Sequence, residues 1–490
     1  MQEKRKDPKN REKENQQKSQ YMQERRKDPK NREKENQQKS QHMQEKRKDP
    51  ILRGKENQKN KVQMQNQLLP DHLPGAAAAP REDGHLNARG RRQVSTTTRT
   101  FEDGKHFHRT SLLIKAFNHK FRLDLELNTQ LLAPNIVQKH YLPSGFAQDS
   151  HREIEHCYYH GTVKDYPGAS AAFHTCNGVS GVIHVGNETF VIHPFYGGDL
   201  SKHPHVIFEA RTKSNKGCAN SGNLEWRTRN VRRQQQAGHH SGLVESRDAN
   251  GAGRYRRDVR DATKYIETAL IIDKAMFQKR NGSTRAEVVH DAIQVANIAD
   301  LYFRTLNTRV SVVYIETWQG QNQAKIDGGQ DISKAISNFN DYTARNLFKI
   351  DKDTTQLLTG ETYAGGEAGM SVPETVCTPK AVGISVDINT YEPHLLAGTM
   401  AHMIGHNIGM GHDDNRDECI CRDWHGCIMS QSIVGLENVQ PYKFSECSRL
   451  DYIDALRIGH GLCLLNKPNE VRFGHSCQTA GFFFVASQGG

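Results

Sequence analysis

The fold is decided by residues 402–413, which read His-Met-Ile-Gly-His-Asn-Ile-Gly-Met-Gly-His-Asp. In a helix, His402 and His406 are four residues apart and therefore lie on one face. Gly409 can adopt the left-handed conformation that ends a helix. The chain would then turn back and present His412 beside the first two histidines. The spacing thus predicts three imidazoles that converge on one point.

This spacing is typical of a zinc-binding helix. The pattern is H-E-x-x-H, extended by G-x-x-H and a downstream Met-turn, and Met429 in Cys427-Ile428-Met429 is the candidate for that turn. The alternative is two histidines on a helix face and an unrelated loop histidine, which does not account for the combined pattern. Three neutral imidazoles suffice for an open tetrahedral site. We therefore expect zinc at His402, His406 and His412.

Met403 stands where the pattern has its glutamate. That glutamate takes a proton from the zinc-bound water, and a thioether cannot accept a proton at neutral pH. Glu392 precedes His402 by about three helical turns, which is too far to replace it. Asp413 follows the third histidine, where a carboxylate normally has a structural role. The sequence therefore predicts metal ligands without a general base.

The head of the chain is a basic repeat that cannot form a core. Residues 1–63 hold three copies of one unit, with net charges of +3, +3 and +4, against +11 for the whole chain. The rest is close to neutral. Because apolar residues are almost absent, we expect the repeat and its linker, residues 1–100, to be disordered. A nucleic-acid role is the alternative. Only Tyr21 interleaves the charges, so we expect no nucleic-acid partner.

No export or membrane segment is recognisable. No apolar run follows the basic residues to form a signal peptide, and no stretch is long enough to span a membrane. The cysteines and two glycosylation sequons, at Asn187 and Asn281, are nevertheless typical of secreted proteins. We expect an extracellular or cell-surface location reached through the secretory pathway. Membrane contact would come only through segments absent from this chain.

The folded part begins near Phe101. Residues 110–228 favour strands, with a hairpin over 181–194. Arg254, Arg256 and Arg257 then form a basic processing sequence in a polar loop, for which a solvated charge run is the alternative.

The sequence from 263 to 467 predicts an α/β layered domain. We expect strands at 268–272, 310–315, 355–358 and 383–388, and helices at 285–306, 331–348 and 393–409. The helix at 393–409 would carry the histidines and be the last of the chain.

From about residue 105 to 475 the chain resembles the ADAM family of reprolysin-type metalloproteases. Residues 155–161 and 172–178 resemble its prodomain signature. Residues 356–360, the histidine helix, 427–429 and 463–468 resemble its metalloprotease domain, and 443–448 are similar to its neuronal, proteolytically inactive branch.

The resemblance implies a zincin-type metalloprotease domain, a mixed sheet with helices, preceded by a β-rich prodomain. It divides the chain into a disordered head and linker (1–100), a prodomain (101–235), a processing loop (236–260), a metalloprotease-like domain (261–470) and a truncated tail (471–490).

Cysteine pairing is likewise implied by the resemblance, because spacing alone gives no connectivity. The family pattern implies Cys377–Cys463, Cys419–Cys427, Cys421–Cys447 and Cys157–Cys176, and leaves Cys218 and Cys477. Cys218 resembles the thiolate that caps zinc in latent family members. A free or mispaired prodomain thiol is the alternative.

A calcium site is implied in the same way. Glu267, Asp353 and Asn466, with the carbonyl of Cys463, fall at the family's positions, and oxygen ligands suit calcium. The alternative is a set of ordinary surface residues.

Three functions remain open. The first is a pseudoprotease that binds an extracellular or cell-surface protein ligand in adhesion, for instance an extended chain paired to a sheet edge in the open cleft. The second is an active zinc metalloendopeptidase with another group as its base. The third, a basic scaffold, rests only on the charge of the head. A general base typically contributes about 10²–10⁴-fold to the rate, so we expect the first.

Overall fold

The computed structural model describes residues 106–150, 154–194, 205–211, 216–220, 259, 261–414, 416, 419, 427–431 and 442–468. All of them fall within one compact unit of the chain, Leu69–Gly490. The repeat head, the three processing arginines, Cys421 and Cys477 lie outside the described residues.

The first sheet is antiparallel and has the order β1-β2-β5-β6-β7-β8-β9. Its residues alternate with the period of two that strands require. Phe121, Leu123 and Leu125 belong to a hydrophobic core that this sheet's own side chains form. Tyr158, Ala172 and Val182 belong to a second core, which also includes residues of helices. The expected hairpin at 181–194 is present as β7 and β8. The strands are β1 Arg109–Ala116, β2 His119–Leu127, β5 Tyr158–Val163, β6 Ser170–His174, β7 Ser180–Val185, β8 Glu188–Pro194 and β9 His205–Glu209.

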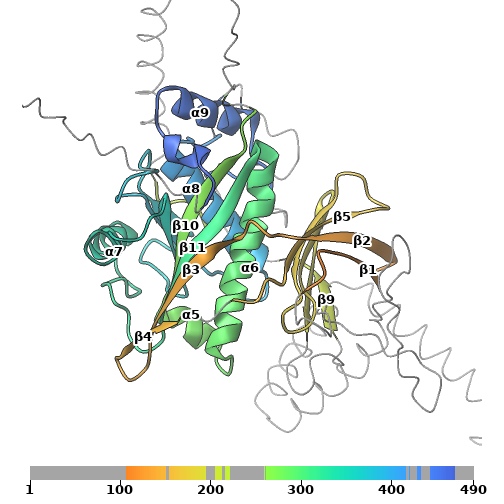
Figure 1. Ribbon diagram of the computed structural model, residues 1–490, viewed down its shortest axis with the longest axis horizontal. Coiled ribbons are helices and arrows are strands. Elements are labelled where there is room, and N and C mark those ends of the chain that lie inside the picture. Colours follow the sequence, from red (N-terminus) through yellow and green to blue (C-terminus); the bar gives the residue numbers. More distant parts are fainter. Residues whose placement is uncertain are drawn as a thin grey trace, which may run out of the picture. The chain divides into compact units, whose positions relative to one another are not determined.

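The second sheet is mixed and has the order β13-β14-β12-β10-β11-β3-β4. Figure 1 shows β10, β11 and β3 of this sheet side by side. Its central strands are parallel, and β10 and β12 are buried along their whole length, as parallel strands between helical layers usually are. The strands are β3 Leu132–Tyr141, β4 Ala147–Ser150, β10 Lys264–Ile272, β11 Thr308–Trp318, β12 Thr354–Thr359, β13 Gly369–Ser371 and β14 Val382–Val386.

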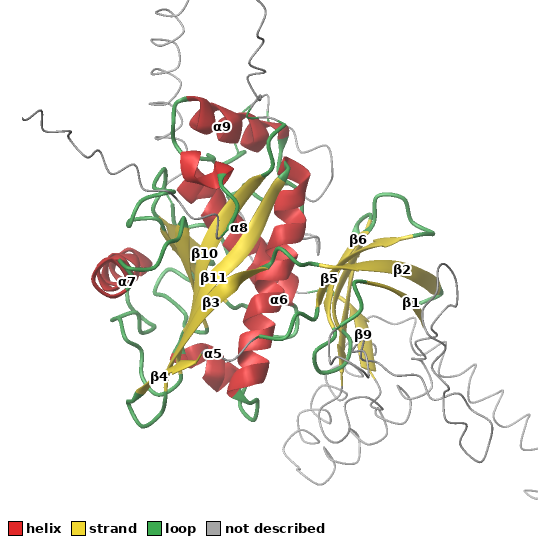
Figure 2. Ribbon diagram, viewed as in Figure 1, coloured by secondary structure: helices red, strands yellow, loops and turns green. Residues whose placement is uncertain are grey.

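Helices cover both faces of the second sheet (Figure 2). The core on one face includes residues of α6 and α8, and the core on the other includes residues of α7. The layers place α8, which carries the histidines, directly on the sheet. The helices are α5 Lys274–Lys279, α6 Arg285–Phe303, α7 Ile332–Asn346, α8 Pro393–Ile408 and α9 Glu446–Arg457, with short 3-10 turns at η2 Arg304–Leu306 and η3 Leu462–Leu465. Among the described residues, no helix is long and apolar enough to cross a membrane.

The prediction that the histidine helix is the last helix was wrong, because α9 follows it. A start signal was present in the sequence: the Ser445 side chain accepts the Ser448 N–H at 2.9 Å and caps the helix. The apolar stripe is short, with Tyr452, Ile453 and Leu456 as its main buried residues. The short elements α5 and β13 were also not predicted.

Strands β3 and β4 come from the N-terminal region but complete the C-terminal sheet. β3 pairs in parallel with β11, from Val312↔Leu132 to Trp318↔Tyr141. Parallel pairing of strands so distant in sequence leaves no local signal, since neither a turn nor a crossover helix links them directly. The two parts of the chain therefore share one sheet.

The implied disulfides are partly corrected. Cys157–Cys176 and Cys377–Cys463 are bonded as implied. Cys419, however, is bonded to Cys447. The implied pairs Cys419–Cys427 and Cys421–Cys447 were therefore both wrong. The first turn of α9 brings the Cα of Cys447 to 5.4 Å from that of Cys419, within the range of a disulfide. Cys427 is also disulfide-bonded.

Candidate metal centre

Helix α8 begins and ends where its sequence requires. Pro393 occupies its first turn, where the missing N–H leaves no hydrogen bond unmade. Gly409 ends it with φ of 116°, and its N–H donates to the carbonyls of Gly405 and His406. The helix therefore holds His402 and His406 one turn apart on the same buried face.

The return of the chain after Gly409 brings His412 to the same point. Met410 N–H donates to Gly405 O at 2.9 Å, which tightens the turn. Gly411 N–H donates to Asp451 of α9 at 3.0 Å, and Arg416 pairs with the same carboxylate at 2.8 Å. Helix α9, which the sequence analysis missed, thus fixes the loop that carries the third histidine.

The three imidazoles converge through their Nε2 atoms. His402 and His406 are 3.0 Å apart at these atoms, His402 and His412 3.2 Å, and His406 and His412 3.1 Å. Three nitrogens around a tetrahedral zinc ion would lie about 3.3 Å from one another. The arrangement therefore has the dimensions of a metal site.

Hydrogen bonds on the opposite ring nitrogens orient two of these histidines. His402 Nδ1 lies 2.6 Å from the carbonyl of Ile428, and His406 Nδ1 lies 3.0 Å from that of Met410. Each Nδ1 donates, so each Nε2 keeps its lone pair for a metal. Burial lowers the pKa of His402 to about 3 and lowers that of His412, which keeps both rings neutral.

Cys218 supplies a fourth donor to the same point. Its Sγ lies 3.5 Å from His406 Nε2, and its sulfur and the three imidazoles all lie within 4.8 Å of one another. The thiol is buried and takes part in no disulfide. Three imidazoles and a thiolate are a donor set that zinc favours. The residues present therefore fit zinc, which when bound acts as a Lewis acid.

The segment around Cys218 lies along the edge strand β13. Ala219 N–H donates to Gly369 O at 3.0 Å, and Ala368 N–H donates to Gly217 O at 2.9 Å, as in a parallel bridge. Cys218 N–H donates to Gln431 O at 2.9 Å on the opposite side. The open cleft expected from the sequence is thus lined along β13 by the chain's own residues. Asn220, which the sequence analysis did not single out, bonds the Ser371 backbone at 2.8 and 3.0 Å.

Met403 faces the cleft and is completely buried. It forms an apolar cluster with Cys218 and Ala368, against which Ile388 packs. A thioether therefore lies beside the donor group, where the zinc-helix pattern has a carboxylate. On the opposite side, a Cβ at Gly405 would meet Met429 Sδ at 2.6 Å, so this glycine permits the Met-turn to pack beneath the histidines.

The two carboxylates considered from the sequence do not join the donor group. Asp413 Oδ1 accepts from Ser445 Oγ at 2.6 Å, which ties the histidine loop to α9. Burial raises the pKa of Asp413 to about 6. Glu392 lies at the start of α8, away from His402. Among the described residues, the group that contains the three histidines includes no aspartate or glutamate.

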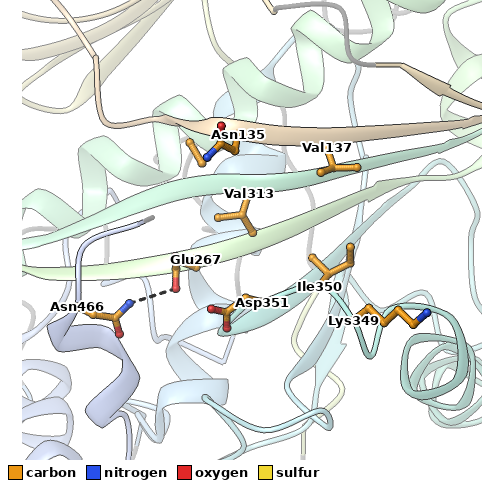
Figure 3. A pocket seen from close by; sticks show the side chains of 9 residues that line it. Asn135, Val137, Glu267, Val313, Lys349, Ile350, Asp351 and Asn466 are labelled. Atoms are coloured by element: carbon orange, nitrogen blue, oxygen red, sulfur yellow. Dashed lines mark hydrogen bonds between the residues drawn. The ribbon is translucent and has the colours of Figure 1, made fainter. Parts of the chain in front are cut away.

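Two residues of the implied calcium site, Glu267 and Asn466, line one pocket (Figure 3). Their Oε2 and Nδ2 atoms are 3.4 Å apart. Asp353 accepts the Glu267 N–H at 2.9 Å, and the Cys463 carbonyl accepts the Asn466 N–H at 3.3 Å. Asp351, a carboxylate missed in the sequence analysis, also lines this pocket. Calcium there stays a prediction.

Loss of a histidine is expected to weaken metal binding far more than loss of Met403. His406→Ala removes one of the converging nitrogens, and we expect a fall in zinc affinity beyond the roughly 10–100-fold typical of losing an outer partner of a ligand. Met403→Ala removes no donor and should change the affinity little. Competition with a chromogenic zinc chelator measures both. Equal affinities for the two variants would contradict the assignment of the ligands.

Comparison with known proteins agrees with this geometry. The profile of the Reprolysin (M12B) family zinc metalloprotease matches residues 264–468, and that of the Reprolysin family propeptide matches residues 61–164. The mouse disintegrin and metalloproteinase domain-containing protein 11 is 31% identical over 385 residues, which are 74% of this chain and 46% of that protein. The Caenorhabditis elegans protein unc-71, of the same description, is 30% identical over 376 residues, 75% of this chain and 35% of its own length.

Among solved structures, metalloproteinase II from Bacteroides fragilis aligns with a TM-score of 0.38 and 12% identity, over 74% of this chain and 99% of that one. The chain spans less than half the length of the two sequence relatives. With both the propeptide and the metalloprotease domain matched, and with ADAM-type relatives along three quarters of its length, the chain belongs to the reprolysin (M12B) family.

Proposed function

We propose that this chain is a pseudoprotease: an ADAM-type domain that holds zinc but does not hydrolyse peptide bonds. The observation that carries the proposal is the buried thioether of Met403 beside three convergent histidines. Hydrolysis requires a group that takes a proton from the attacking water. A thioether sulfur is too weakly basic to take a proton at neutral pH, and Asp413 already accepts a hydrogen bond from Ser445.

Restoring the carboxylate is expected to create activity. Met403→Glu in a chain that lacks residues 216–220, so that neither the thiol nor the backbone along β13 fills the cleft, should raise peptide hydrolysis about 10²–10⁴-fold over the same chain with Met403. The measurement is cleavage of a quenched fluorescent peptide library. Met403→Gln, which has nearly the same shape but no basic carboxylate, is the matched control. Equal rates of hydrolysis for the Glu and Gln variants would show that the absence of a base does not limit hydrolysis by this chain.

We further propose that the folded part acts outside the cell as a ligand for a cell-surface or extracellular protein. Three disulfides between described residues require an oxidising compartment. Asn187 lies in the exposed turn between β7 and β8, and Asn281 is exposed between α5 and α6, so both sequons are open to a glycosyltransferase.

Secretion tests this second part. The full chain behind a heterologous signal sequence should reach the medium with oxidised cysteines and carry glycan at Asn281, which Asn281→Gln removes. Binding of the purified protein to intact cells, with and without prior trypsin treatment of the cell surface, then tests for a protein receptor. An endogenous chain that stays in the cytosol with reduced cysteines would refute the extracellular role.

A further inference from the structure

Residues 106–220, the described propeptide region with its gaps, contact both edges of the metalloprotease sheet. At one edge, β3 pairs in parallel with β11 from Val312 to Trp318. At the other edge, Cys218 forms a parallel bridge with Gly369 of β13. The exposed backbone of an edge strand readily pairs with another chain, and here the propeptide fills both positions.

Helix α6 also binds the propeptide backbone through buried amides. Gln294 Nε2 donates to Ala172 O at 3.0 Å. Asn297 Nδ2 lies 3.2 Å from Tyr159 O and 3.3 Å from Phe173 O. Both side chains are at most 2% exposed. A helix normally buries one face. Helix α6, however, packs against the second sheet and also against β5 and β6 of the first sheet.

A buried ion pair reinforces this contact. Asp300 of α6 is fully buried, pairs with Arg309 of β11 at 2.7 Å, and accepts from Asn128 of the propeptide at 2.8 Å. Arg309 in turn donates to Asn128 Oδ1 at 2.7 Å. Removing the propeptide would take one member out of a buried network, and such a loss is costly.

The donor set of the metal centre also favours a propeptide that stays bound. Catalytic zinc sites keep one position open for water, whereas structural sites have four protein ligands. Here three imidazoles and the Cys218 thiol form a four-donor group, and Met403 and Ala368 pack against the thiol. No water is needed in a site without a base, so the thiolate need not leave.

We propose that the propeptide is a permanent part of the folded protein, and that the metal centre is a structural site with one cysteine and three histidine ligands. Cleavage in the segment 221–258 then leaves two polypeptides that stay together. This inference rests on the proposed absence of catalysis, because an active protease must vacate the site. If the propeptide stays along β13, a partner protein must bind to another surface of the molecule.

The test uses the full chain, with one recognition site for a sequence-specific protease inserted within residues 229–253. After cleavage, the two fragments should co-elute in size-exclusion chromatography at neutral pH, with one metal ion per complex. Cobalt substituted for zinc should show thiolate-to-metal charge transfer that is unchanged by cleavage and absent in Cys218→Ser. Separation of the fragments, or loss of the thiolate band on cleavage, would overturn the proposal.

A second variant separates the contributions of the metal and the protein contacts. Cys218→Ala should bind metal more weakly, yet its cleaved fragments should still co-elute because β3 and α6 hold the propeptide. If they separate, the sheet and helix contacts do not make the propeptide permanent, and the proposal fails. None of these readouts measures turnover, so a failure here is distinguishable from a failure of the pseudoprotease assignment.

Discussion

Acidification from pH 6.5 to 4.5 is expected to open the contact between the propeptide sheet and α6. Three histidines of this contact are buried: His160, His174 and His184. Burial lowers their pKa values to about 4, about 3 and about 3, respectively. In the unfolded chain a histidine titrates near 6.5. Between these values the unfolded state binds protons that the folded state excludes, so stability falls as the pH falls.

The groups around each ring explain why its pKa is lowered and not raised. Desolvation is the largest effect on the pKa of His160. It outweighs Asp300 and the Asn297 carbonyl, which favour the charged ring, and Arg304 and Arg309 oppose the charge as well. His174 faces His290 and His193, which oppose its charge as well.

His184 contacts the Tyr302 hydroxyl at 3.1 Å and stacks on Tyr442, with His394 nearby. Each of the three histidines is therefore expected to remove about 1.4 kcal/mol of stability per pH unit in this window.

Hydrogen exchange of α6 amides between pH 7 and 4, corrected for intrinsic exchange, measures the effect. The chain carries His406→Ala, so that acid release of metal does not contribute. His174→Gln combined with His184→Gln should flatten the pH dependence, and His460→Gln, at an exposed position, should not. If exchange of the α6 amides depends on pH equally steeply in the double variant, this account is contradicted.

Replacing Asp300 with alanine is expected to cost about 3–5 kcal/mol of stability, because it leaves Arg309 without its buried partner. The carboxylate also accepts the Val310 N–H at 2.7 Å and the Asn128 amide at 2.8 Å, and both would lose their acceptor. Asp341→Ala removes an exposed carboxylate of α7 and should change stability by less than about 0.5 kcal/mol. Urea unfolding midpoints compare the two. Similar midpoints would show that Asp300 stabilises the fold no more than an exposed carboxylate does.

Local pattern was enough to predict the convergence of the three histidines and most of the α/β domain. His402, His406 and His412 are linked by a helix and a glycine turn, which short-range geometry dictates. The apolar periodicity of residues 285–306 likewise predicted α6 together with the short turn η2. The identity of residue 403 alone showed that a methionine stands at the glutamate position of the pattern.

Long-range pairing could not be predicted in the same way. The addition of β3 to β11 and the bond between Cys419 and Cys447 depend on where distant segments meet. Asn297 looks like one polar residue in an apolar helix, and only the structure shows that its amide binds the propeptide backbone. The occupied edge of β13 was missed for the same reason, because Gly217 and Ala219 bond through their backbones.

The most direct test of the pseudoprotease assignment is the hydrolysis of denatured proteins and peptide libraries by the zinc-loaded, cleaved chain with Met403 in place. Metal content is measured on the same sample, and a chain that lacks residues 216–220 is assayed alongside so that the segment along β13 cannot mask activity. We predict stoichiometric zinc and no turnover above that of a His402→Ala, His406→Ala control. Turnover that a zinc chelator abolishes, at a rate comparable to that of Met403→Glu, would contradict the assignment.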